Sequence, residues 1–152
     1  MYRSGLATLL TLVVLTATVF AEPPVPFGKT YCGRDSLNPK RDDLDDAQDC
    51  LDGLVWTAAK FKVRCDRPRE RTGDMLIRFP SPVPSGDANN DLVAMEWYVA
   101  HDEEKKPITA PAVVVVHESG SNMTVGRMFA RGLRLQGLHA FMIQLPYYGE
   151  RR

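Results

Sequence analysis

The amino-acid sequence predicts an α/β fold in which antiparallel strands are followed by one parallel β-α-β unit. The clearest sign is the order of residues 111–152, which run as apolar strand, polar loop, amphipathic helix, glycine stop and second strand. Strand-length apolar runs at 56–63, 74–80 and 92–100 precede this unit and are separated by turn residues. With 44% hydrophobic and 25% charged residues, the composition is that of an ordinary globular protein.

The length and charge of the chain limit its organisation and its partners. A chain of 152 residues accommodates one domain at most. It carries 19 Lys and Arg against 19 Asp and Glu, so it has no basic excess of the kind that nucleic-acid-binding domains use to reach phosphates. We therefore expect no nucleic-acid partner.

Residues 1–21 have the three parts of a secretory signal peptide. Arg3 gives a positive start, residues 6–20 carry no charge, and Val19 and Ala21 place small residues at a cleavage site. The apolar stretch is short for a transmembrane helix, which needs about 20 apolar residues. We expect cleavage and export to the periplasm or the extracellular space. The alternative is an uncleaved N-terminal anchor, which would make the membrane a partner.

Residues 22–53 form the second segment, a Pro-rich start followed by a short acidic helix. The start, 22–33, is expected to run extended along a surface. Within 42–53, apolar residues recur at helical spacing and aspartates occupy the remaining face, with Gly53 as the stop. The aspartates lack the alternation and the fixed glycine and glutamate of a calcium-binding loop. We therefore expect no metal site and no cofactor.

The cysteines bear on the compartment, because export permits disulfides. The three cysteines are Cys32, Cys50 and Cys65, and an odd number leaves at least one thiol unpaired within the chain. We favour a Cys32–Cys50 disulfide, which would close a modest loop around the acidic segment. The alternative is three reduced, buried cysteines. The sequence contains no C-x-x-C motif, which argues against a zinc ribbon or thioredoxin-type chemistry.

Residues 54–152 form the third segment, which holds the predicted sheet. Its first part suggests two or three antiparallel strands. The continuous β-branched run at 112–116 suits a central strand covered on both faces. A helix is expected from near Val125 to a stop at Gly137, followed by a strand over 138–145. We expect this last strand to need a further parallel neighbour, since an apolar strand at a sheet edge invites aggregation.

Five consecutive elements at the end of the chain form a pattern that can be compared with known folds. They are the strand VVVV, the loop HESGSN, the helix GRMFARGLRLQG, the strand HAFMIQLP and the turn YYGERR. In this order they resemble the N-terminal half of an α/β-hydrolase core, nearest to its dienelactone hydrolase and acetyl-esterase branches. The similarity covers roughly residues 61–152 and is sharpest over 113–152. It implies an ester hydrolase acting on a small-molecule ester.

The resemblance implies that residues His117, Glu118, Ser119 and Gly120 supply part of an oxyanion hole. The family commonly has His-Gly-x here, and the backbone N–H of Ser119 would be one of two donors to the developing oxyanion. Glu118 departs from the usual glycine and matches instead the dienelactone hydrolase pattern, in which a glutamate contacts the nucleophile. The alternative is a carboxylate placed near the positive end of a helix dipole.

The family carries its nucleophile on a G-x-S-x-G elbow after the next strand, and no G-x-[Ser/Cys]-x-G occurs in this sequence. We therefore expect no catalytic residue in this chain, with structural roles for His117 and His139. The expected function is that of the N-terminal fragment of a secreted α/β-hydrolase-type ester hydrolase, with an incomplete fold and no activity of its own. The alternative is a small exported non-catalytic binding or structural protein, or a hydrolase remnant.

Overall fold

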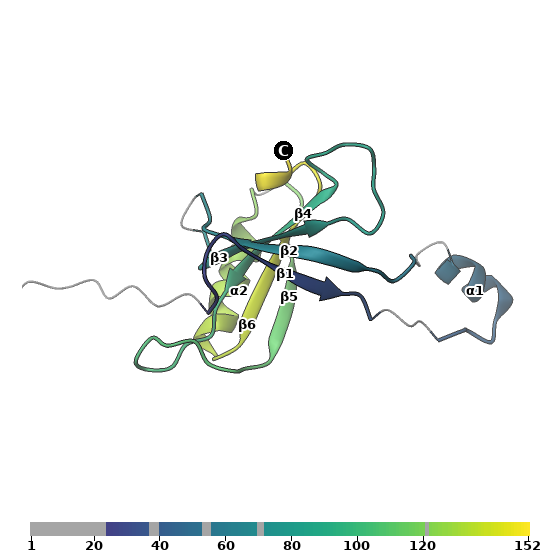
Figure 1. Ribbon diagram of the computed structural model, residues 1–152. Helices are drawn as coiled ribbons and strands as arrows, with labels where there is room; N and C mark the ends of the chain where they lie inside the picture. Colours follow the sequence, from purple (N-terminus) through teal and green to yellow (C-terminus); the bar gives the residue numbers. More distant parts are fainter. Residues whose placement is uncertain (1–23, 37–39, 53–55, 70–71, 121) are drawn as a thin grey trace, which may run out of the picture.

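The computed structural model describes residues 24–36, 40–52, 56–69, 72–120 and 122–152 (Figure 1). The predicted signal peptide, 1–21, lies outside the described residues. The elements in chain order are β1 Lys29–Arg34, α1 Asp45–Asp52, β2 Lys60–Asp66, β3 Met75–Pro80, β4 Leu92–Tyr98, β5 Ala112–Val116, α2 Thr124–Leu135, β6 His139–Gln144 and the 3-10 helix η1 Gly149–Arg151.

The strands form one open, mixed sheet of six strands in the order β1-β2-β3-β4-β6-β5. The pairs β1–β2, β2–β3, β3–β4 and β4–β6 are antiparallel, and β5–β6 is parallel. Antiparallel strands therefore come first along the chain and one parallel β-α-β unit follows. This arrangement confirms the predicted α/β class.

The positions of β5 and β6 correct two predictions. Strand β5 lies at the edge of the sheet and not at its centre, and Val114 and Val116 are 60% and 64% exposed. Strand β6 is the one with neighbours on both sides, because the chain returns from α2 between β4 and β5. The open edge at this end of the sheet is therefore that of β5. A β-branched run suits a strand, but it does not say whether both faces are covered.

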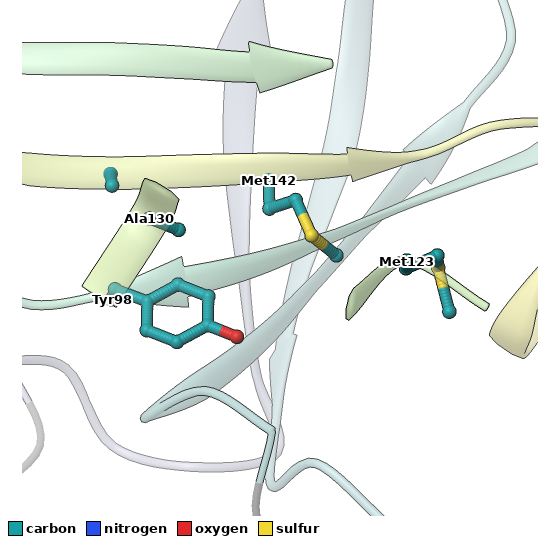
Figure 2. Close-up of a cluster of buried hydrophobic side chains, with 5 residues drawn as sticks. Tyr98, Met123, Ala130 and Met142 are labelled. Atoms are coloured by element: carbon teal, nitrogen blue, oxygen red, sulfur yellow. The ribbon is translucent and has the colours of Figure 1, made fainter. Parts of the chain in front are cut away.

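Helix α2 covers one face of the β4-β6-β5 part of the sheet. Beneath it a buried cluster joins the helix and its first turn to β4 and β6: Tyr98, Met123, Ala130, Ala140 and Met142 (Figure 2). The predicted glycine stop is confirmed, since Gly137 has φ +76°. Its N–H donates to Arg134 O and that of Leu138 donates to Leu133 O, which is the Schellman end of a helix.

The opposite face carries a second buried cluster at the β2-β3 end of the sheet, formed by Cys65, Met75 and Ile77. Val25, Phe27 and side chains from neighbouring strands pack against it: Tyr31, Val63, Phe79, Met95, Trp97 and Phe141. Part of the cover comes from the segment around β1. The sequence predicted this segment only as extended, whereas the structure makes it a strand paired with β2.

Helix α1 confirms the predicted acidic helix but stands apart from the rest. It has no buried residue and makes no contact with another described helix or strand, and Figure 1 shows it away from the sheet. All three cysteines lie among the described residues and are free, with Cys32 and Cys50 exposed and Cys65 buried. The predicted Cys32–Cys50 disulfide is thus not formed in this structure, because α1 carries Cys50 away from β1.

Candidate functional site

The candidate site is the loop of residues 117–120, which leaves the carboxyl end of β5. In open α/β sheets, ligands bind beyond the carboxyl ends of parallel strands, where loops from neighbouring strands meet. The turn after β6 emerges at the same edge, since β5 and β6 are parallel. Three contacts fix the loop to its surroundings, and each involves a backbone N–H group as the donor.

The first contact is made by His117, which is 3% exposed. Its Nε2 accepts a hydrogen bond from the N–H of Leu145, 3.1 Å away. The hydrogen therefore sits on Nδ1, which donates to the carbonyl oxygen of Glu118 at 2.6 Å. Both ring nitrogens form hydrogen bonds with the backbone, so this histidine links the end of β5 to the end of β6.

The second contact is made by Glu118, whose carboxylate turns toward the start of α2. Its two oxygens accept from the N–H groups of Val125 and Gly126, at 3.3 and 3.2 Å. The first N–H groups of a helix have no partner within the helix, and a negative charge there is favourable. Of the two roles considered for Glu118, this geometry is that of the helix-terminal carboxylate.

The third contact comes from outside the loop, through Tyr148 in the turn after β6. Its hydroxyl oxygen accepts from the N–H of Gly120 at 3.0 Å, and its ring meets that of His117 edge-on at 4.6 Å between centroids. The sequence pattern did not identify this tyrosine. The available signal was an aromatic residue in the turn after the second parallel strand.

Ser119 lies between these anchored residues and is exposed. No hydrogen bond joins it to any other residue in the described part of the chain, so its N–H is unpaired there. The chain then enters α2 through two residues in the left-handed region, Asn122 at φ 52° and Met123 at φ 65°. Such residues cost about 1–3 kcal/mol each and persist where packing enforces them. Here the side chain of Met123 is 2% exposed in the core.

Beside the loop, a buried carboxylate ties α2 to the sheet. Glu96 on β4 is 1% exposed and accepts from Arg127 at 2.7 Å, from the Tyr98 hydroxyl at 2.8 Å and from the Gln144 side chain at 3.1 Å. Burial first, and then the charge of Glu96, raise the pKa of Tyr98. A cavity of about 380 Å³ lies beside this cluster and is lined in part by Glu96, Arg127 and Asn122. The carboxylate is fully satisfied, which fits an anchoring role.

The structure keeps the four predicted loop residues together and adds Leu145 and Tyr148 to them. Among the described residues, no group of three His, Cys, Asp or Glu side chains is placed to hold a metal ion. No helix in the described ranges has the length and apolar character needed to cross a bilayer.

Comparison with protein-family models, with curated proteins and with solved structures found no match for this chain.

Proposed function

We propose that this chain is the N-terminal part of an exported α/β-hydrolase-type carboxylic-ester hydrolase, and that residues 117–120 contribute to its oxyanion hole. In the reaction, a serine or cysteine attacks the ester carbonyl, the alcohol leaves, and water hydrolyses the acyl-enzyme. The nucleophile, on a G-x-[Ser/Cys]-x-G elbow, would come from polypeptide outside these 152 residues.

The observation that supports this proposal most is the N–H of Ser119, which has no partner among the described residues although the loop around it is anchored. Negative charge grows on the carbonyl oxygen during acyl transfer, and donors that are already in place stabilise it without having to reorganise. His117 and Glu118 are fixed on one side of this amide and Gly120 on the other. The loop can therefore present a donor at the carboxyl edge of the parallel strands.

The open edge of β5 also supports the proposal. Its outward N–H and C=O groups have no strand beside them in the described part of the chain, and a further parallel strand could pair there. A strand added at this edge would end next to residues 117–120. An elbow following that strand would then place its nucleophile beside the Ser119 amide, as the acyl-transfer chemistry requires.

The test is a substitution that removes one backbone donor. Ser119→Pro deletes the N–H, whereas the matched control Ser119→Ala removes the hydroxyl and keeps the N–H. In the product of the complete open reading frame, we expect Ser119→Pro to lower kcat for p-nitrophenyl acetate by about 10²-fold, with little change in the alanine variant. Circular dichroism would verify that both variants are folded.

Two results would contradict the proposed function. One is that the complete open reading frame encodes no G-x-[Ser/Cys]-x-G elbow after β6 and its product does not hydrolyse the ester. The other is a folded Ser119→Pro variant that hydrolyses the ester as fast as the wild type.

A second candidate function is that of a non-catalytic binding protein, which one observation favours. Helix α2 exposes four large apolar side chains: Val125, Met128, Phe129 and Leu135. Exposed apolar patches mark interaction sites. A complete protein that lacks ester turnover would favour this candidate.

A further inference from the structure

We infer that the hydroxyl group of Tyr148 is a second oxyanion donor, acting beside the amide of Ser119. This inference rests on the proposed function and adds a catalytic residue to it. The tyrosine comes from the turn after β6, so it reaches the loop after β5 across the carboxyl edge of the two parallel strands.

The hydroxyl is held in position before any substrate binds. The Tyr148 ring packs edge-on against His117, which is itself buried and bonded to the N–H of Leu145. The Tyr148 N–H donates to the carbonyl oxygen of Leu145 at 3.2 Å, which fixes the backbone of the turn. Donors that are fixed in this way cost no reorganisation when charge develops in the transition state.

The hydrogen-bonding capacity of the phenol leaves its proton available. A tyrosine hydroxyl can accept and can also donate one hydrogen bond. Tyr148 accepts from the N–H of Gly120 at 3.0 Å, and none of the described residues accepts from its O–H. A hydroxyl that accepts one bond is polarised and donates a stronger one. The O–H of Tyr148 is therefore a strengthened donor next to an exposed loop.

This arrangement changes how the loop can act on a carbonyl oxygen. The amide of Gly120 is engaged with Tyr148, so its own N–H does not face an incoming oxyanion. Its polarity is instead transmitted through the hydroxyl. In the transition state the carbonyl oxygen would accept from the O–H of Tyr148 and from the N–H of Ser119. Tyr148 keeps its proton throughout, so no bond to hydrogen breaks in this step.

The test compares Tyr148→Phe with Tyr147→Phe in the product of the complete open reading frame. Tyr147 is the adjacent tyrosine and is 69% exposed, which makes it a matched control. Loss of a single donor that acts in the transition state lowers kcat and kcat/KM together. We expect Tyr148→Phe to lower kcat for p-nitrophenyl acetate by about 10²-fold with KM nearly unchanged. Tyr147→Phe should retain the wild-type kcat.

A second set of variants distinguishes a catalytic role of Tyr148 from a purely structural one. Phenylalanine keeps the ring contact with His117, and fluorinated tyrosines at position 148 keep the hydroxyl while making it more acidic. If the hydroxyl donates in the transition state, kcat will vary with the acidity of the phenol, while the melting temperature of the folded protein stays constant. A structural role predicts no such variation in kcat.

The outcomes distinguish the role of Tyr148 from the proposed hydrolase function. A wild-type protein that hydrolyses the ester while Tyr148→Phe does so equally fast overturns the role of Tyr148 and leaves the proposed function standing. A kcat that is flat across the fluorotyrosines also overturns it. A complete wild-type protein without ester turnover overturns the proposed function, and the role of Tyr148 falls with it.

Discussion

At the scale of single residues, the candidate site is held by side chains that bind backbone N–H groups. His117 accepts from Leu145, Glu118 accepts from the first turn of α2, and Tyr148 accepts from Gly120. Each bond satisfies a backbone donor that would otherwise depend on water. The loop thereby gains a defined shape although three of its four residues are polar and only one is buried.

Removing the Glu118 carboxylate should weaken the start of α2. We expect Glu118→Ala to lower the free energy of unfolding by about 1 kcal/mol, because two helix N–H groups lose their acceptor. Glu118→Gln keeps an acceptor oxygen without the charge and should lose less. Urea denaturation of both variants measures this. An alanine variant as stable as the wild type would show that the bonds to Val125 and Gly126 contribute nothing.

The three thiols should differ in reactivity. Burial, and then the neighbouring charge of Asp66, raise the pKa of Cys65, which lowers its thiolate fraction. Cys32 and Cys50 are exposed. With Ellman's reagent near pH 8, we expect two thiols to react quickly and Cys65 to react only when the protein unfolds. If Cys32 and Cys50 react only after a reductant is added, the Cys32–Cys50 disulfide predicted from the sequence is present in solution.

The sequence could locate the site loop but not its contacts. A polar, glycine-containing stretch directly after a β-branched run identifies residues 117–120. The partners of that loop are backbone N–H groups, which every residue except proline possesses, so no residue type signals them in advance. Tyr148 was missed for the same reason. Its partner is the amide of Gly120, and nothing in the side chain of that residue points to a tyrosine.

At the scale of elements, the turn between β3 and β4 shows how carboxylates organise a connection. Asp91 accepts from the N–H and the hydroxyl of Ser85 and from the N–H of Gly86. Asp87 accepts from the N–H groups of Asn90 and Asn89. These hydrogen bonds, with those from Asn90 and Ser85 contributing most, lower the pKa of both carboxyl groups. The turn is therefore built around the charged form of each aspartate.

This turn should make the stability depend on acid. A lowered pKa in the folded state gives a contribution that is fully present above the usual aspartate value of about 3.9 and is lost as the pH falls below it. We expect the wild type to lose more stability than an Asp87→Asn, Asp91→Asn variant between about pH 4 and pH 2. Urea denaturation across this range is the measurement. Parallel losses in the two proteins would contradict the assignment.

Elements were predictable where alternation or strong apolar runs marked them. Strands β3 and β4 and helix α2 lie within a residue or two of the expected ranges. Strand β2 begins at Lys60 and not near Trp56, because its alternation of charged and apolar residues starts there. Strand β1 was missed because the Pro-rich residues before it hid a short alternating run. Its partner, β2, is distant in sequence and only the folded sheet reveals it.

At the scale of the whole molecule, the sheet is covered unequally. Helix α2 packs against Val115, while Val114 and Val116 point to the other face and are largely exposed. Toward β3, that face buries Met75 and Ile77, and the covered area ends before β5. The molecule therefore combines an unpaired strand edge with apolar side chains beside it, a combination that favours association through added strands.

A single charge at this edge should reduce self-association. Val116 on β5 and Val83 in the turn after β3 are both 64% exposed, so Val116→Lys and Val83→Lys form a matched pair. We expect residues 22–152, the chain without its predicted signal peptide, to self-associate in sedimentation experiments at high concentration, Val116→Lys to lower that association, and Val83→Lys to leave it unchanged. Equal effects of the two lysines would indicate that net charge matters and that the β5 edge does not.

The order of strands in the sheet also bears on how the chain is made. Strand β6 is the sole strand partner of β5 within the described residues, and it follows β5 along the chain, beyond α2. On the ribosome, β1 to β4 can pair as they emerge, because each lies beside the strand before it. Strand β5 emerges next with no place to dock and must wait until β6 has been synthesised and inserted against β4. The valines of β5 therefore stay without a strand partner until β6 has been made.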